Sequence, residues 1–117
     1  DDVFDAAMRR AGVLRVRDLS DFFTAAATLG AGVRVRGRRL AIVSNAGGPG
    51  ALAADHASDR RLQVPRLGDE TARQLQSLVF AGDGHANPVY VRADMDATHY
   101  AETVRAVLDE GNVDALR

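Results

Sequence analysis

The chain has 117 residues, of which 46% are hydrophobic and 26% charged, so it is long enough for a globular domain with its own core. The net charge of −1 argues against nucleic acid or a membrane surface as a partner, and no apolar run approaches the roughly 20 residues of a membrane span. All 15 basic residues are arginines and there is no cysteine, which excludes lysine Schiff bases, a P-loop lysine, disulfides and thiolate sites. We therefore expect a cytoplasmic protein.

Two helices are expected at the start of the chain. Apolar residues recur with helical spacing over residues 2–11, and Gly12 ends that segment. Asp18 is a candidate N-cap for a second helix, which Gly30 and Gly32 close. The pattern predicts a helical lead-in over residues 1–36.

An arginine-rich connector follows the second helix. It alternates valine and arginine before becoming basic, and its arginines are Arg34, Arg36, Arg38 and Arg39. We interpret these side chains as solvated rather than as a nucleotide-binding cluster. The connector marks a boundary between the lead-in and a second domain over residues 37–117.

Strands and helices alternate in this second domain. Apolar or alternating runs predict strands at 40–43, 62–67 and 87–91 and the start of another at 112–117, with Pro65 favouring an edge position. Helices are expected at about 50–60, at 69–79 and from Asp96 or Thr98 to 110, and a glycine-rich loop at 80–85. This order predicts a doubly wound parallel α/β sheet.

The stretch Ser44–Gly50 is the main candidate for a binding site. It joins the apolar strand 40–43 to an alanine-rich helix, and its three glycines allow backbone conformations that other residues avoid. Pro49 suits a first helical turn. The free N–H groups of that turn, with the helix dipole behind them, form a site for phosphate or another anion. We expect Asn45, Gly47, Gly48 and Gly50 to bind phosphate, with Ser44 on the same face.

A second turn could share that face. Asn87-Pro88 opens the third predicted strand, and we include Asn87 as a candidate ligand-face residue. Asp94 and Asp96 are expected to cap the last helix rather than to hold Mg²⁺. The three histidines, His56, His85 and His99, lack metal-ligand spacing, so exposed structural roles are expected for them and no metal site is predicted. No catalytic residue can be assigned.

The chain resembles the NDP-forming acyl-CoA synthetases, the relatives of succinyl-CoA synthetase, over nearly its whole length. The segments that carry the resemblance are Asp5–Val13, Val16–Phe23, Gly37–Asn45, the loop Asn45–Gly50 with Ala54-Asp55, and Asn87-Pro88-Val89. The glycine loop is the most specific of these segments. The family's phosphohistidine motif lies upstream of the segment that Asp5–Val13 resembles.

The resemblance implies a fold, an activity and partners. It implies a flavodoxin-like CoA-ligase domain in a fragment that is not catalytic alone and contains no cofactor. The parent would interconvert acyl-CoA, phosphate and a nucleoside diphosphate with carboxylate, CoA and triphosphate through a phosphohistidine. It would use ATP or ADP, CoA and Mg²⁺. Its CoA-binding and ATP-grasp domains, in the same chain or a second subunit, would be the partners of this fragment.

One departure from the family keeps alternatives open. The family usually carries an aspartate after Asn-Pro-Val, where this chain has Tyr90. The chain could therefore be a degenerate, acyl-CoA-sensing regulatory domain of a protein lysine acetyltransferase. A free-standing flavodoxin-like domain for FMN or another phosphate ligand is a further alternative, although only 5% of the residues are aromatic and there is no tryptophan to stack on a flavin.

Overall fold

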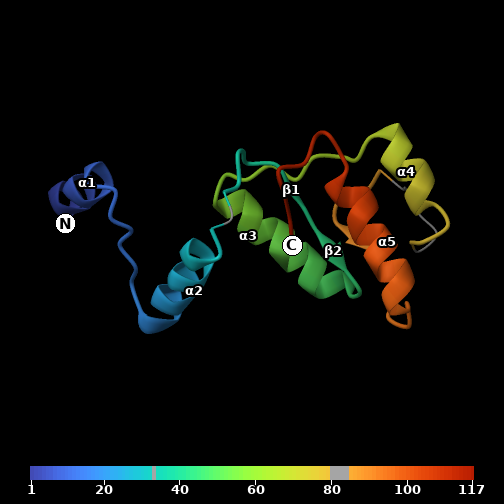
Figure 1. Cartoon of the computed structure of the whole chain (residues 1–117), viewed down its shortest axis with the longest axis horizontal. Coiled ribbons are helices and arrows are strands. Elements are labelled where there is room, and N and C mark those ends of the chain that lie inside the picture. Colours follow the sequence, from blue (N-terminus) through green and yellow to red (C-terminus); the bar gives the residue numbers. More distant parts are fainter. Residues whose placement is uncertain (33, 80–84) are drawn as a thin grey trace. The chain divides into compact units, whose positions relative to one another are not determined.

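The computed structural model describes residues 1–32, 34–79 and 85–117. It divides the chain into two compact units, Asp1–Arg34 and Val35–Arg117 (Figure 1). Of the loop predicted at residues 80–85, all but His85 lies outside the described residues. Within the described ranges, no helix has both the length and the apolar character needed to cross a membrane.

The first unit contains the two predicted helices, α1 (Asp2–Arg10) and α2 (Leu19–Gly30). Gly12 ends α1 with φ +72°, and its N–H donates to the Arg9 carbonyl while the following N–H, of Val13, donates to Met8. This is the Schellman arrangement, which requires the left-handed backbone that glycine allows. The Asp18 carboxylate caps α2 by accepting from the Asp21 N–H at 2.8 Å. Both helix boundaries predicted from sequence are confirmed.

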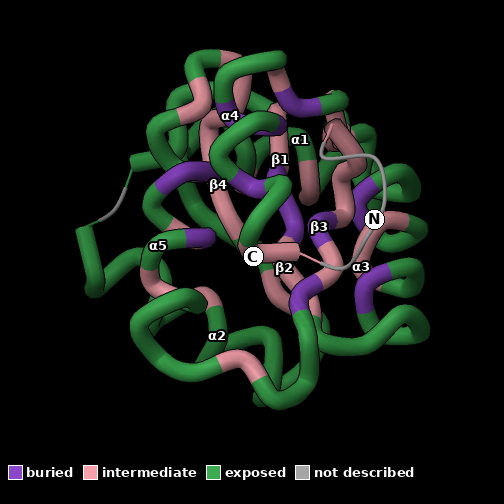
Figure 2. The backbone as a smooth tube through the Cα atoms, turned by 90° about the vertical axis from the view of Figure 1, so that its right-hand side faces the viewer, coloured by how far each residue is buried: buried purple, intermediate pink, exposed green. Residues whose placement is uncertain are grey.

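Neither α1 nor α2 buries a residue, and Figure 2 draws α2 without a buried segment. Six of their large apolar side chains are half or more exposed; these are Val3, Phe4, Leu19, Phe22, Phe23 and Leu29. Helices in proteins draw most of their stability from packing an apolar face. These two helices therefore present exposed apolar faces.

The second unit is built on one central extended segment. It comprises β1 (Leu40–Ala41) and β2 (Val43–Ser44), with Ile42 between them. β1 pairs in parallel with β4 (Ala115–Leu116), and β2 pairs in parallel with β3 (Val89–Tyr90). The hydrogen bonds of the central segment alternate sides, so β3 and β4 lie on opposite edges of it. The predicted parallel pairing is confirmed for these short strands.

The strand expected at residues 62–67 does not form. Only Gln63 pairs with the central segment: it exchanges backbone bonds with Arg38 and Leu40, each 2.8 Å long. Pro65 lacks an N–H and cannot extend a ladder. The strand expected at 87–91 is likewise shorter than predicted.

Three helices cover the two faces of these strands (Figure 1). On one side α4 (Asp69–Leu75) and α5 (Ala97–Leu108) contact each other, and α5 also contacts β4. On the other side α3 (Gly47–Asp59) contacts β2. The core lies on the α4–α5 side and comprises Ala41, Leu67, Leu75, Val89, Val91, Ala106 and Val107. The predicted helix 69–79 is too long, because the helical bonding ends at Leu75 and a turn follows.

Arg39 and Asp114 fasten β4 to the central segment. The guanidinium donates from Nε and Nη2 to the two carboxylate oxygens at 2.9 and 2.7 Å, and the Arg39 N–H donates to the same carboxylate at 2.9 Å. These bonds to Arg39 hold the pKa of Asp114 at about 2, below its usual 3.8. A solvated role for all the connector arginines is therefore wrong at Arg39, whose partner lies 75 residues away.

The stability of the second unit is expected to fall as pH drops from about 4 toward 2. Because the pKa of Asp114 is lowered by folding, its contribution is complete above the unfolded pKa and is lost as the pH falls through the folded pKa of about 2. We expect Asp114→Asn to unfold at lower urea concentration than the wild type at pH 7, with the difference shrinking toward pH 2. Urea titrations followed by circular dichroism at several pH values measure this, with Asp59→Asn as the control for loss of one surface charge. A difference between Asp114→Asn and wild type that stays constant with pH would contradict the assignment.

Candidate functional site

The glycine-rich stretch forms the first turn of α3. Gly47 is its first residue and Ala46 its N-cap, with extended backbone and no side-chain cap. The helix thus begins three residues before the predicted start at about 50. The expectation that the loop glycines adopt unusual backbone conformations is wrong: in the described chain, the glycines with positive φ are Gly12 and Gly32.

The N-terminus of α3 leaves backbone donors free. Ser44 closes the turn before it, because its hydroxyl donates to the Ala46 carbonyl at 2.8 Å and accepts the Ala46 N–H at 3.2 Å. The Gly50 N–H donates to the Ala46 carbonyl at 3.3 Å, and Pro49 has no N–H. The N–H groups of Gly47 and Gly48 find no acceptor among the described residues. They remain available to an anion.

The positive end of the α3 dipole is also uncompensated. The first turn of α3 contains no acidic residue. Each of the other four helices has an aspartate at its N-cap or in its first turn. The carboxylates of Asp18 and Asp96 each accept a hydrogen bond from a backbone N–H of the helix that they cap. An anion at an uncapped helix N-terminus is stabilised by the dipole and by the free N–H groups together.

The loop glycines have two different roles. A Cβ built on Gly47 or Gly48 would meet nothing within 4 Å, so this side of the turn is open to a ligand. A Cβ on Gly50 would lie 2.7 Å from Cε1 of Tyr90 and 3.2 Å from Cβ of Ser44. Gly50 is therefore needed so that α3 can pack against β2 and β3.

A pocket lies beside the loop at the carboxyl ends of β2 and β3. Its volume is about 290 Å³, and its lining residues are Val43, Ser44, Asn45, Val91, Arg92, Ala93, Met95 and Tyr100. Asn45 is exposed, and its amide has no hydrogen bond within the described chain. The carboxyl ends of parallel strands are where α/β proteins bind ligands. Asn45 and the α3 N-terminus therefore share one end of the strands.

Arg92 is the charged residue of this pocket, and the sequence reading did not select it. Its Nε and Nη2 donate to the two oxygens of Asp94 at 2.8 and 2.7 Å. The Arg92 side chain lowers the pKa of Asp94, and Asp94 in turn raises the pKa of Arg92. The expectation that Asp94 caps the last helix is therefore wrong. Arg92 lies two residues after β3, and this position at a strand end is the sequence signal that could have identified it.

Asn87 does not lie at this end of the strands. It precedes β3, whereas Asn45 follows β2, and because the two strands are parallel these positions are at opposite ends. The Asn87 amide donates to the carbonyls of Leu40 and Pro65 at 2.9 Å each and accepts the Ile42 N–H at 3.0 Å. Its amide thus fills the gap in the ladder between Gln63 and β3. The expected shared face is not found, since all three bonds of Asn87 are structural.

The histidines do not converge on the site. His56 is exposed on α3, whereas His85 is half-buried and its Nδ1 lies 2.9 Å from the Leu67 carbonyl, so exposure was a wrong expectation for His85. Asp96 caps α5 as predicted, accepting the His99 N–H at 2.9 Å. Its carboxylate also lies 2.6 Å from His99 Nδ1 and raises the pKa of that imidazole. The described residues contain no group of three or more His, Asp or Glu that could hold a metal ion.

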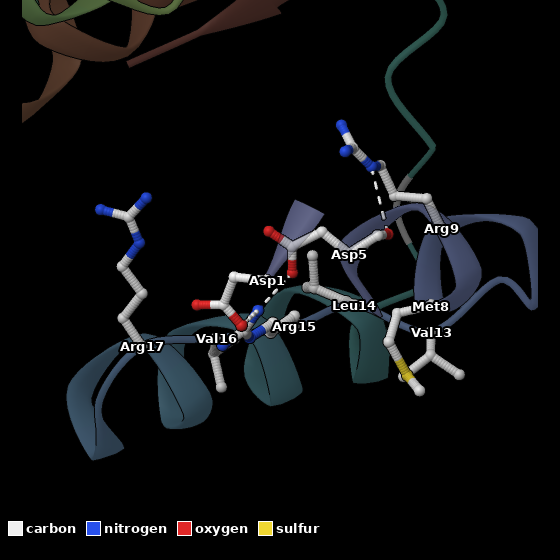
Figure 3. A pocket seen from close by; sticks show the side chains of 9 residues that line it. All are labelled: Asp1, Asp5, Met8, Arg9, Val13, Leu14, Arg15, Val16 and Arg17. Atoms are coloured by element: carbon white, nitrogen blue, oxygen red, sulfur yellow. Dashed lines mark hydrogen bonds and ion pairs between the residues drawn. The ribbon is translucent and has the colours of Figure 1, made fainter. Parts of the chain in front are cut away.

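A larger pocket, of about 620 Å³, lies in the first unit between α1 and residues 13–17 (Figure 3). Three of its charged side chains pair with one another: the Arg15 guanidinium binds the carboxylates of Asp1 and Asp5, and it lies 5.4 Å from the Phe4 ring centre. Arg9 donates to the Asp5 carbonyl at 3.3 Å. The two carboxylates of this pocket are therefore already paired with Arg15.

Comparison with known proteins finds homologues among the ADP-forming CoA ligases. No protein-family model matches the chain. The α subunit of acetate–CoA ligase (ADP-forming) II from Pyrococcus furiosus is 32% identical over 97% of the chain, and acetate–CoA ligase (ADP-forming) I from Archaeoglobus fulgidus is 30% identical over 98%. The chain is homologous to one segment of the ADP-forming acyl-CoA ligases. It spans 25% of the length of the Pyrococcus furiosus ligase subunit and 16% of the Archaeoglobus fulgidus ligase.

A solved structure of similar sequence shares the fold of the chain. A crystal structure from Pyrococcus horikoshii OT3 superimposes with a TM-score of 0.86 and 31% identity, over 98% of the chain and 26% of that protein. The resemblance expected from the loop Asn45–Gly50 and its flanks is thus confirmed, as is the mixed α/β character of the segment with parallel strands.

Proposed function

We propose that the chain is a non-catalytic segment of an NDP-forming acyl-CoA synthetase, in which the N-terminus of α3 stabilises a phosphoryl group carried by a histidine from elsewhere in the enzyme. The observation that carries this proposal is the pair of free N–H groups at Gly47 and Gly48 on an uncapped helix without acidic residues. Fixed donors of this kind stabilise a mobile phosphate without having to reorganise. The names of the relatives as ADP-forming CoA ligases support the reaction class.

The site residues take distinct parts in this proposal. Gly47 and Gly48 supply N–H groups, and Asn45 supplies an amide that can orient a phosphate oxygen. Ser44 and Gly50 act indirectly: the Ser44 hydroxyl holds the turn, and Gly50 lets Tyr90 and α3 meet. Asn87 serves the strand pairing and takes no part in binding.

Gly48→Val in a full-length ligase that contains this segment is expected to lower the rate of phosphohistidine formation or turnover by about 100-fold. The added side chain would keep the phosphoryl group away from the free N–H groups, with an effect similar in size to losing one preorganised donor. The valine side chain has room in the fold, since a Cβ at Gly48 meets nothing within 4 Å, but it occupies the approach of the phosphate. Rapid-quench incorporation of labelled phosphate from acyl-CoA and inorganic phosphate measures the rate.

The matched control is Gly111→Val. Gly111 also has open space around its Cβ direction and lies outside the loop, after α5. This variant should phosphorylate like the wild type. If Gly48→Val does so as well, the proposed role of the loop is incorrect.

The finer fold assignment belongs to the same proposal. We propose that residues 37–117 form a flavodoxin-like CoA-ligase domain and that residues 1–36 are its helical lead-in. Parallel strands with α3 on one face and α4 and α5 on the other support a doubly wound arrangement.

The partners proposed for the segment are the CoA-binding and ATP-grasp domains of such a ligase, in the same chain or a second subunit. The exposed apolar side chains of α1 and α2, Phe22 and Phe23 among them, support burial against other parts of the enzyme. ATP or ADP, CoA and Mg²⁺ would be used by the complete ligase.

The three homologues compared above do not favour the alternatives. Both curated relatives are named as CoA ligases, so the acetyltransferase and flavin alternatives gain no support from them. Tyr90 is the residue that motivated the first alternative. In the structure its ring lies against Gly50 at the first turn of α3, so the tyrosine has a packing role there.

A further inference from the structure

Four exposed arginines lie on two adjacent segments at the amino-terminal ends of the strands, away from the glycine-rich start of α3. Arg36 and Arg38 belong to the segment that leads into β1, whereas Arg60 is the C-cap of α3 and Arg61 follows it. The Gln63 N–H donates to the Arg38 carbonyl at 2.8 Å, so the chain after α3 runs beside the segment before β1 (Figure 1). All four arginines belong to the second unit, and we call them the arginine patch.

The register of these segments brings the two halves of the arginine patch within reach of one partner. Arg39 lies opposite Gln63 in a parallel bridge, so Arg38 lies opposite Leu62, the residue after Arg61. Neighbouring strands are about 4.8 Å apart and consecutive Cα atoms about 3.8 Å apart, which places the Cα atoms of Arg38 and Arg61 within about 10 Å of each other. Guanidinium groups this close can bind neighbouring anions of the same surface.

The arginine patch is barely neutralised within the described residues. Arg60 donates to the His56 carbonyl at 3.3 Å, and the other three members form no ion pair or side-chain hydrogen bond there. Asp59 is the one carboxylate in the segments 35–39 and 57–63. By contrast, four other arginines of the described chain each bind a carboxylate; these are Arg15, Arg39, Arg73 and Arg92.

Arg61 occupies a backbone position that glycine would fill more easily. Its φ of +58° lies in the left-handed region. The helix ends there with bonds from the Arg61 N–H to the Ser58 carbonyl and from the Leu62 N–H to the Ala57 carbonyl. Gly12 occupies the equivalent position at the end of α1, where the absence of a Cβ avoids the steric cost. The arginine therefore adds a charge at this position although it strains the backbone.

The surroundings of the arginine patch favour a protein surface over a small anion or a nucleic acid. None of the four arginines lines either pocket described above, whereas small ligands bind in concave sites. The segments 35–39 and 57–63 contain no aromatic residue on which a base could stack. Val35, which is 56% exposed, adds an apolar contact beside Arg36, and arginine is enriched in protein–protein interfaces.

We propose that the arginine patch docks an acidic surface of another protein domain, through ion pairs with its glutamate and aspartate side chains. Guanidinium groups bind carboxylates through two parallel hydrogen bonds. The patch and the glycine-rich turn lie at opposite ends of α3, so a docked partner leaves that turn accessible. This inference does not depend on the phosphoryl-binding role proposed above.

Binding of an acetylated hexaglutamate peptide to the ¹⁵N-labelled chain tests the inference by NMR. We expect the peptide to shift the Nε–H signals of the four patch arginines more than that of Arg105 on α5, and to bind more weakly as salt is added. A thymidine oligonucleotide of the same charge should bind no more tightly than the peptide, because it finds no aromatic side chain for its bases.

Arg61→Gly separates a binding role from a structural one. It removes a charge and relieves the left-handed backbone, so the variant should unfold at a higher urea concentration than the wild type. It should nevertheless bind the peptide about threefold more weakly, the effect of one exposed ion pair, and adding Arg38→Gln should bring the loss to about tenfold. Arg105→Gln is the matched control, since Arg105 is also an exposed arginine at the end of a helix, and it should leave the affinity unchanged.

Three results would overturn the inference: no binding of the peptide to the wild type at low salt, an unchanged affinity in Arg38→Gln/Arg61→Gly, or an equal loss in Arg105→Gln. Tighter binding of the oligonucleotide through the same four arginines would overturn the assignment to an acidic protein surface. The proposed function is tested separately by Gly48→Val, so the failure of one proposal can be told from the failure of the other.

Discussion

Asn87→Asp is expected to destabilise the second unit by about 3 kcal/mol, although it exchanges only an NH₂ group for an oxygen. The Asn87 amide donates to the carbonyls of Leu40 and Pro65, each at 2.9 Å, so an aspartate would place an oxygen against two other oxygens. The bond from the Ile42 N–H to the remaining oxygen is kept. Urea unfolding followed by circular dichroism measures the loss.

The matched control for this change is Asn45→Asp. Asn45 is exposed and has no hydrogen bond within the described chain, so the same chemical change there should alter the free energy of unfolding by less than about 0.5 kcal/mol. A carboxylate close to the α3 N-terminus could even stabilise that helix. Equal stabilities of Asn87→Asp and Asn45→Asp would show that the hydrogen bonds of the Asn87 side-chain amide do not stabilise the fold.

Gly50→Ala is expected to cost about 1–3 kcal/mol, the usual cost of overpacking a close contact. The new Cβ would lie 2.7 Å from the Tyr90 ring and 3.2 Å from Ser44, so the ring must leave the first turn of α3. Gly48→Ala is the matched control in the same turn. Its Cβ meets nothing, and alanine favours helix over glycine, so this variant should be as stable as the wild type or more so.

A double-mutant cycle assigns the cost to the contact. Tyr90→Ala removes the ring that the new Cβ would meet, so the loss in Gly50→Ala/Tyr90→Ala should be smaller than the sum of the single losses by about 1 kcal/mol. Strictly additive losses would mean that the cost of Gly50→Ala comes from the helix backbone rather than from Tyr90.

Local signals in the sequence predicted most of the helices. Gly12 and Asp18 mark the end of α1 and the start of α2 through bonds to neighbours only a few residues away. Asp96 predicted the start of α5 for the same reason. Strand lengths were predicted less well. In the run 62–67 only Gln63 pairs with the central segment, because Pro65 has no N–H with which to continue the ladder.

The residues of the candidate site also divide into those that local sequence predicted and those that depend on distant segments. The loop Asn45–Gly50 could be found because a glycine-rich turn between an apolar run and a helix is a local pattern. Arg92 could not be selected from residue type alone, since what matters is that the segment after β3 faces the loop after β2. Asn87 was misplaced because its partners, Ile42 and Leu40, lie 45 and 47 residues away.

From the sequence alone, we could predict the resemblance to the acyl-CoA synthetases, most of the helices, and a helix that starts in the glycine-rich stretch after Val43. These depend on residue order and on bonds within one or two turns of chain. The folded structure was needed to establish which residues share the carboxyl ends of β2 and β3 and that Gly50 allows packing against Tyr90. It also showed that the N–H groups of Gly47 and Gly48 have no acceptor among the described residues. Those properties depend on the parallel register of distant segments, which places Tyr90 beside Ser44 and leaves Asn87 at the opposite end.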